Sequence, residues 1–154
     1  MSRTVKLFRC SPEQIFKVLS DGWSYASWVV GASRIRDVDS TWPAKDSQIH
    51  HSVGSWPILL NDTTTVAAID APHSLTLRAR AWPFGEAEVV IECEPEGAGV
   101  TRVTMVEQSA SGPAKLLPPP LTDPVLHARN SEALRRLAYL AERGGHATSR
   151  SSAE

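Results

Sequence analysis

A glutamate stands where the last predicted strand should turn an apolar side chain inward. In the segment Thr101–Gln108, Val103 and Met105 share one parity, and Glu107 continues it. An unpaired buried carboxylate is too costly to keep, so an inward Glu107 needs an ionic partner or a cavity with water. In such a cavity it could give or take a proton. The alternative is that the sheet ends before Glu107, which would then lie in solvent.

Two adjacent histidines form the second candidate for chemistry. His50 and His51 fall in the predicted strand Gln48–Val53, where neighbouring side chains point to opposite faces. They cannot bind one metal ion together, and only one of them can face the core. An inward His51 would be a base in a cavity. The alternative is a core histidine whose hydrogen bonds are made within the protein.

Polar side chains also interrupt the apolar stripe of the last predicted helix. Asn130 lies four residues after Leu126 and four before Leu134, on the face that should pack against the sheet. A buried amide must be hydrogen-bonded, either by nearby backbone or by a ligand and water in a cavity. His127 lies one turn before Asn130 and is expected to join it. Glu107, His51 and His127 are therefore the catalytic candidates, with no choice among them.

No sequence motif for a metal, a nucleotide or a hydrolytic nucleophile accompanies these residues. The chain has no HExxH, GxSxG, GxGxxG or Walker-type sequence, and Cys10 and Cys93 lack the spacing of metal ligands. Hydrolase, kinase and nucleotide-dependent redox functions have no support. We expect neither a metal nor a cofactor.

The elements that must position these side chains follow from capping signals and periodicity. Ser11 and Gln14 match a capping box, so we expect a strand at Thr4–Arg9 and then two short helices between Pro12 and Trp28. Helical spacing of apolar residues predicts a long closing helix from about Thr122 to Arg143. Alternation and turn signals between them predict antiparallel strands at Ser33–Val38, Gln48–Val53, Asp62–Ile69, Ser74–Trp82, Glu86–Glu94 and Thr101–Gln108.

Alternate turns of an antiparallel meander lie at the same end of its sheet. This geometry should bring Trp28, Trp56 and Trp82 to one opening near Glu107. The alternative is that the tryptophans plug the end of a solid core. For an open cavity, the predicted ligand-binding residues are Trp28, Trp56, Leu77, Trp82, Val89, Val103, Met105, Glu107, His127, Asn130 and Leu134.

The length and charge of the chain limit the kinds of partner it can have. Its 154 residues form one domain, predicted at residues 1–143, with a small and polar tail at 144–154 that should be disordered. A net charge of −1 gives no electrostatic reason to bind nucleic acid or an anionic membrane. No apolar run is long enough for a membrane span or resembles a signal peptide, so we expect a cytoplasmic monomer or homodimer.

Three stretches of the chain carry a family resemblance. They are SPEQIFKVLSDGWSYASWVVG, HHSVGSWPILLNDTTTV and RNSEALRRLAYLAER. Together with the order of elements, they resemble the START-like (SRPBCC) superfamily of polyketide cyclases, dehydrases and lipid transport proteins, over roughly Arg3 to Arg143. The resemblance implies an α+β helix-grip fold, in which a curved antiparallel sheet wraps around a long C-terminal helix and two short helices follow the first strand.

The same resemblance implies a ligand class. We expect the chain to bind or carry a small, mostly apolar molecule, lipid or polyketide-like, between the sheet and the closing helix. One alternative is a cyclase or aromatase in which Glu107 with His51 or His127 moves protons; the cyclases share no fixed catalytic motif, so no residue transfers by position. A second alternative is a non-catalytic regulatory interaction module, for which an outward Trp23 or Tyr25 would be the sign.

Overall fold

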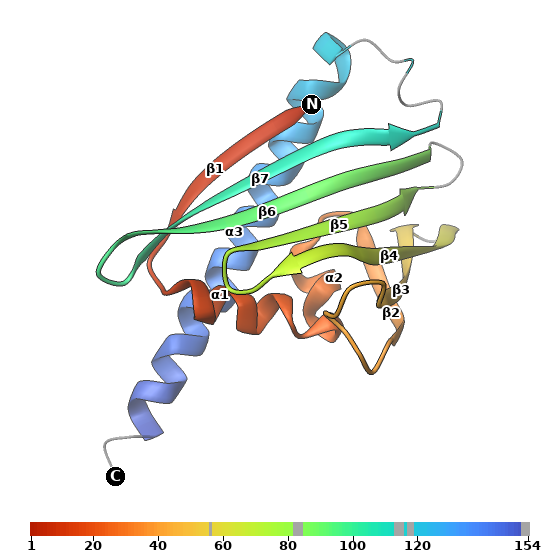
Figure 1. Cartoon of the computed structure of the whole chain (residues 1–154). Coiled ribbons are helices and arrows are strands. Elements are labelled where there is room, and N and C mark those ends of the chain that lie inside the picture. The colour runs from red at the N-terminus through yellow and green to blue at the C-terminus, as the bar shows by residue number, and fades with distance from the viewer. Residues whose placement is uncertain (56, 82–84, 113–115, 117–118, 152–154) are drawn as a thin grey trace.

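A single curved antiparallel sheet and one long helix dominate the computed structural model (Figure 1). The structure describes residues 1–55, 57–81, 85–112, 116 and 119–151. The elements are β1 (Ser2–Phe8), α1 (Pro12–Leu19), η1 (Gly22–Ser24), α2 (Tyr25–Trp28), β2 (Ala32–Val38), β3 (Gln48–Ser55), β4 (Ile58–Asp70), β5 (Ser74–Ala81), β6 (Gly85–Gly97), β7 (Val100–Ser111) and α3 (Pro119–Ser151). This architecture confirms the predicted helix-grip fold.

The first strand of the chain pairs with the last, which leaves β1 and β2 as the two edges of the sheet. Its seven strands run in the order β1-β7-β6-β5-β4-β3-β2, so that only the β1–β7 pairing joins distant parts of the chain. In the β6–β7 ladder, Cys93 lies opposite Val103, Ile91 opposite Met105 and Val89 opposite Glu107. Cross-strand partners share a face. The register therefore places Glu107 on the inner side of the sheet, as the parity of the sequence predicted.

The helices after β1 begin as the capping signals predict. Gln14 N–H donates to the side chain of Ser11, and Ser11 N–H donates to the side chain of Gln14, which completes the capping box. The helix α1 then buries Ile15, Phe16 and Leu19. The short 3-10 turn η1 redirects the chain into α2, which buries Tyr25 and Trp28.

Helix α3 is longer at both ends than the sequence predicted. It begins at Pro119 rather than near Thr122, contains Pro124, and continues past Arg143 to Ser151. Pro124 is the sixth residue of this helix, just beyond the four N-terminal positions whose N–H groups have no intrahelical partner, so it removes one backbone hydrogen bond near the helix start. Disorder of residues 144–154 stays a prediction. Within the described part of the chain, no helix is long and apolar enough to cross a membrane.

Helix α3 crosses one face of the sheet and packs on β1, α1 and α2 (Figure 1). Its buried side chains Ala133, Leu134, Leu137, Ala138 and Ala141 follow helical spacing, as expected for an amphipathic helix. They meet inward residues of β5, β6 and β7 in one apolar core. This core occupies only part of the space between the helix and the sheet.

Candidate functional site

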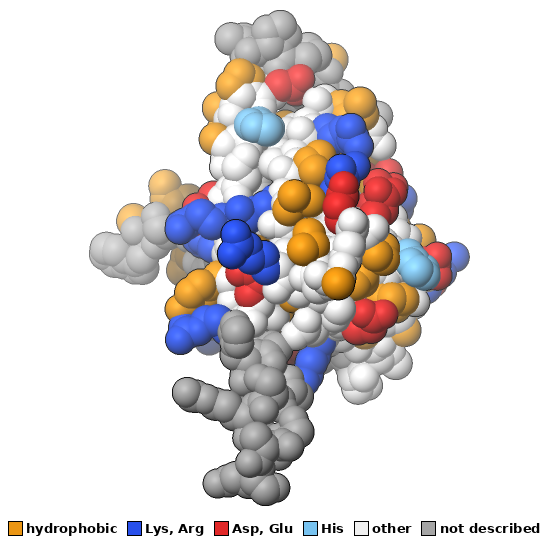
Figure 2. Space-filling view, turned by 90° about the vertical axis from the view of Figure 1, so that its left-hand side faces the viewer, with side chains coloured by type: hydrophobic (Ala, Val, Ile, Leu, Met, Phe, Trp, Pro, Cys, Tyr) orange, Lys and Arg blue, Asp and Glu red, His pale blue; other side chains and the backbone are white. Residues whose placement is uncertain are grey.

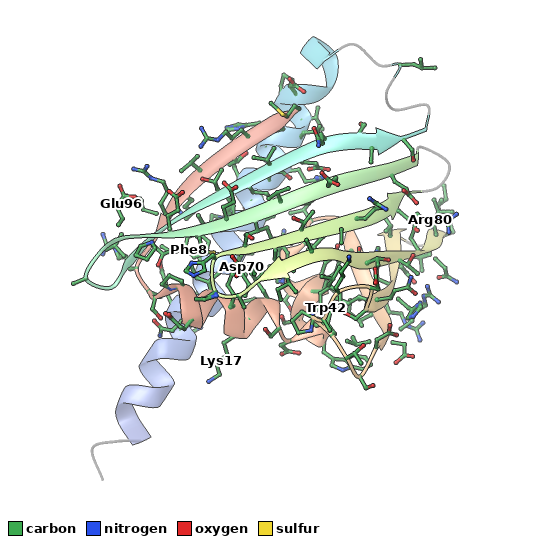
Figure 3. All side chains as sticks on the ribbon, in the orientation of Figure 1. Phe8, Lys17, Trp42, Asp70, Arg80 and Glu96 are labelled. Carbon is green, nitrogen blue, oxygen red and sulfur yellow. The ribbon has the colours of Figure 1, made fainter. Side chains whose placement is uncertain are left out.

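A cavity of about 240 Å³ lies between the sheet and α3, at the end of the sheet where β5 stops and β6 starts. Figure 3 labels Arg80, a lining residue, at this end, whereas Phe8 and Glu96 lie at the opposite end. The junction of α2 and β2, four strands and α3 contribute to its wall. The lining consists of Tyr25, Trp28, Val29, Val30, Gly31, Ala32, His51, Val53, Leu77, Ala79, Arg80, Gly85, Glu86, Ala87, Val89, Met105, Glu107, Ser109, Leu126, Arg129, Asn130 and Ala133.

Glu107 lines this cavity as one half of an ion pair. The residue is only 4% exposed, and Arg129 Nη2 on α3 donates to its Oε1. The guanidinium itself reaches the surface, since the Arg129 side chain is 41% exposed. The second carboxylate oxygen, Oε2, is buried and has no hydrogen-bond partner among the described residues. Arg129 therefore compensates the charge, while one acceptor oxygen stays free for another molecule.

A hydrogen-bonded chain of three side chains forms a second polar group at the cavity. The hydroxyl of Thr64 lies 2.9 Å from the Tyr25 hydroxyl and 2.9 Å from His51 Nε2. Thr64 has one hydroxyl hydrogen, so only one of its two partners can accept from it. His51 Nδ1 is buried and has no partner in the described part of the chain. The direction of the hydrogen bond between Thr64 and His51 Nε2 decides whether Nδ1 acts as a donor or an acceptor.

Burial keeps the two side chains that bond to Thr64, those of His51 and Tyr25, uncharged near neutral pH. Burial lowers the pKa of His51 below its ordinary value; nearby Asp62 opposes the shift, and the positive charge of Arg36 adds to it. Burial likewise raises the pKa of Tyr25 to about 12. A neutral imidazole and a neutral phenol therefore line the cavity.

A layer behind His51 holds this strand pair in place. Asp62 on β4 lies opposite His51 on β3, and both residues are buried. Arg36 Nη2 donates to the carbonyl oxygens of His51, at 3.3 Å, and of Asp62, at 3.1 Å. These contacts fix the backbone that carries His51. His50 points the other way, with its Nε2 3.6 Å from the carboxylate of Asp39.

Asn130 is the third polar group at the cavity. Asn130 is 3% exposed, and its side-chain nitrogen Nδ2 has no hydrogen-bond partner within the residues that the structure describes. Buried amides are normally paired, so an unpaired one that lines a cavity points to water or a ligand. Of the two alternatives for Asn130, the structure favours the one in which it faces the cavity.

Several predicted ligand-binding residues meet at this cavity. Trp28, Leu77, Val89, Met105, Glu107 and Asn130 line it, as does the candidate base His51. Trp28 is 4% exposed and packs edge-on against Tyr25, so it forms an inner wall. Trp56 and Trp82 lie outside the described residues. A ligand-binding role for all of these residues stays a prediction.

Three predicted lining residues lie elsewhere. Val103 and Leu134 are both fully buried in the packed core, because α3 closes directly onto the sheet at their level. His127 is exposed, and its Nδ1 lies 3.2 Å from the Thr4 hydroxyl on β1. His127 and Asn130 are three positions apart, which separates them by about 60° around the helix axis, and His127 contacts β1 while Asn130 lines the cavity. His127 and Glu107 are therefore not brought together.

The sequence interpretation missed Tyr25, Thr64 and Arg129. Thr64 has the same strand parity as the buried Val66, so alternation alone could have found it. Arg129 lies three residues after Leu126 and four before Ala133, so helical spacing places it beside the apolar stripe, but spacing alone does not identify the side chain that it contacts. Among the described residues, no cluster of His, Cys, Asp or Glu could hold a metal ion.

Comparison with known proteins identifies a family and a fold. The family model described as polyketide cyclase / dehydrase and lipid transport matches residues 1–142. The chain is similar to protein NE0264 from Nitrosomonas europaea, with a TM-score of 0.70 and 15% identity over 94% of this chain and 95% of that one. A protein from Arthrobacter aurescens gives a TM-score of 0.70 at 12% identity, covering 92% and 85% of the two chains.

A further structural neighbour comes from a biosynthetic locus. DynU16, a protein in the dynemicin biosynthetic locus, gives a TM-score of 0.64 at 15% identity; the match covers 93% of this chain and 47% of DynU16. No curated protein sequence matches this chain. At such low identity the structural neighbours establish the fold alone.

Proposed function

The chain belongs to the polyketide cyclase / dehydrase and lipid transport family, and from that premise we propose that it binds a compact, mostly apolar molecule in the cavity between the sheet and α3. The observation that carries this proposal is a cavity of about 240 Å³ with apolar walls and unpaired polar atoms. A protein interior is normally close-packed, and its buried polar atoms are normally paired. A cavity that breaks both rules is best explained by an occupant.

The size of the cavity favours a small ring system. Pockets for drug-sized ligands typically measure ~300–1,000 Å³, and this one, at about 240 Å³, is slightly smaller. A molecule of one or two fused rings fits this space better than a long acyl chain. The proposal is therefore the compact end of the ligand class that the sequence resemblance implied.

Native mass spectrometry of the purified protein tests this proposal, together with displacement of an apolar fluorescent probe. We expect a co-purifying small molecule, or else probe binding that quenches tryptophan emission. Ala87 lines the cavity, so Ala87→Leu should fill it and weaken probe binding at least about tenfold. Ala128→Leu, at an exposed position of α3, is the matched control and should bind normally. No binding by the wild type, or equal binding by Ala87→Leu, contradicts the proposal.

A second candidate function is proton-transfer catalysis of the cyclase or aromatase type. The observation that favours it is that Glu107 and His51, each with an unpaired polar atom, line the same cavity. A carboxylate and a neutral imidazole are common general bases. Once a substrate is known from mass spectrometry, Glu107→Gln should lower turnover by about a hundredfold or more if the protein is such an enzyme. Unchanged turnover removes Glu107 from any catalytic role.

The surface gives little support to the alternative of a regulatory interaction module. Trp23 is 60% exposed, whereas Tyr25 is buried at the cavity. Isolated exposed apolar side chains are normal on protein surfaces, so Trp23 alone does not define an interaction site. The binding proposal accounts for more of the molecule.

A further inference from the structure

The unpaired polar atoms at the cavity have fixed hydrogen-bonding roles, and together they describe a ligand. We propose, on the basis of the proposed binding function, that the cavity selects an uncharged ring compound with two features: a hydroxyl that donates to Glu107 Oε2 and a carbonyl-type oxygen that accepts from Asn130 Nδ2. Neither of these two atoms has a protein partner among the described residues. The residues that carry them are 4% and 3% exposed.

The first requirement follows from the chemistry of a carboxylate. An ionised carboxylate can only accept hydrogen bonds, and Arg129 already occupies Oε1 of Glu107. The buried Oε2 thus demands a donor from inside the cavity. An ether, a ketone or a plain hydrocarbon would leave it unpaired, at a cost comparable to a lost hydrogen bond to a charged group. An O–H group satisfies it.

The second requirement follows from the amide. The NH2 group of Asn130 can only donate, so its occupant must present an acceptor. His51 adds a third, adaptable point, because the Thr64 hydroxyl lets His51 Nδ1 be either a donor or an acceptor. A hydroxyl and a carbonyl on one rigid ring frame meet these demands together.

The charges around Glu107 disfavour an ionised ligand. The charged residues of its lining are Arg80, Glu86, Glu107 and Arg129, two of each sign. Arg129 is already paired with Glu107, and Tyr25 and His51 are neutral for the reasons given above. A bound carboxylate beside Glu107 would therefore share the one guanidinium that already compensates Glu107, and two buried carboxylates would lie close together. An uncharged molecule avoids this cost.

Three probes that share one fused-ring system test whether the cavity selects an uncharged hydrogen-bond donor. We would measure the affinities of 2-naphthol, naphthalene and 2-naphthoate at neutral pH by competition against a bound apolar fluorescent probe. The proposal predicts that 2-naphthol binds at least about tenfold more tightly than naphthalene and than 2-naphthoate. All three have the same fused rings, so the difference reports the polar substituent.

The Glu107→Gln variant tests whether Glu107 causes the preference for 2-naphthol. Arg129 should hold the amide oxygen of the new side chain, so that an NH2 group replaces the acceptor Oε2. The preference for 2-naphthol over naphthalene should then fall to within about twofold. The matched control is Glu92→Gln, on an exposed position of the same sheet, which should keep the wild-type preference. Circular dichroism and thermal melting check that each variant folds.

Asn130→Leu tests the acceptor in the same way with a second pair of probes. Wild type should bind 1-tetralone at least about fivefold more tightly than tetralin, because only the ketone can accept from Asn130. The variant should bind the two equally. Loss of both preferences in either single variant would indicate a general disturbance of the cavity rather than two separate contacts, and would overturn the assignment of roles.

The outcomes separate this inference from the function on which it rests. If none of the probes binds, the proposed ligand-binding function itself fails. If all bind with similar affinity, or if 2-naphthoate binds best, the binding function stands and the proposed ligand chemistry is wrong. If Glu107→Gln retains the preference for 2-naphthol, Glu107 is not the acceptor.

Discussion

The two ends of the space between sheet and helix are built from the same strands and behave differently. Along the β6–β7 ladder, the inward pairs Cys93–Val103 and Ile91–Met105 are apolar and buried. The next inward pair toward the other end is Val89–Glu107, and both of its members line the cavity. Met105 already lines the cavity, so the ladder passes from packed core to cavity over these three pairs.

The packed end and the cavity end contribute differently to the stability of the fold. At the packed end, Leu134, Leu137 and Ile91 are fully buried in one apolar core, which is the arrangement that stabilises a fold most. The surface of that end carries acidic, basic and hydrophobic side chains intermixed (Figure 2). At the cavity end, unpaired polar atoms reduce stability in the absence of a ligand. Residues kept at such a cost are candidates for function.

The largest expected effect contrasts truncations at the two ends. Leu137 is fully buried, so Leu137→Ala should lower the free energy of unfolding by about 3 kcal/mol through lost burial and a new cavity. Val89 lines an existing cavity, so Val89→Ala should cost about 1 kcal/mol or less. Urea unfolding of both variants measures the difference. Equal losses would mean that the cavity end is as well packed as the core.

The ion pair at the cavity should respond unequally to removal of either partner. Arg129→Met leaves the buried Glu107 carboxylate without its hydrogen-bonding cation, and should lower the free energy of unfolding by about 1–3 kcal/mol. Glu107→Gln leaves a guanidinium that reaches solvent, and should cost less than about 1 kcal/mol. Denaturant titrations at neutral pH test the order. A larger loss in Glu107→Gln would contradict the assignment of Glu107 as the buried, dependent partner.

A smaller effect should appear in the dependence of stability on pH. The pKa of His51 lies below its ordinary value in the folded state because of burial. Below about pH 6.5 the unfolded chain therefore binds a proton that the folded chain does not, and stability falls as the pH falls. Between about pH 7.5 and about pH 5.5, His51→Gln should lose less stability than the wild type.

The neighbouring histidine provides the control for this titration. His50 lies on the opposite face from His51, beside Asp39, so His50→Gln removes a histidine without touching the cavity. A wild-type response to acid in His51→Gln, or loss of the response in His50→Gln alone, would show that His51 is not the buried group that resists protonation.

Strand alternation in the sequence predicted most of the fold and part of the site. The inward position of Glu107 followed from the parity it shares with Met105, and that of Asn130 followed from its place in the apolar stripe of α3. Both inferences need only the period of one element. The packed state of Val103 and the outward direction of His127 did not follow, because they depend on how closely the helix approaches each part of the sheet.

The partners of the site depend on tertiary placement. Arg129 reaches Glu107 from another element, and Tyr25 reaches Thr64 across 39 residues of sequence. A period within one element says which way a side chain points and nothing about the side chain that meets it. The four-residue helix α2 is too short to define a face by itself, so the direction of Tyr25 is set by the core around it.

The most direct test of the contrast between the two ends is a methyl NMR titration of the wild-type protein with naphthalene. The cavity account predicts saturable shifts at the methyl groups of Leu77, Val89 and Met105, which line the cavity, and little change at Leu137 in the packed core. The absence of shifts, or shifts spread equally over both groups, would contradict a preformed binding cavity at this end of the sheet.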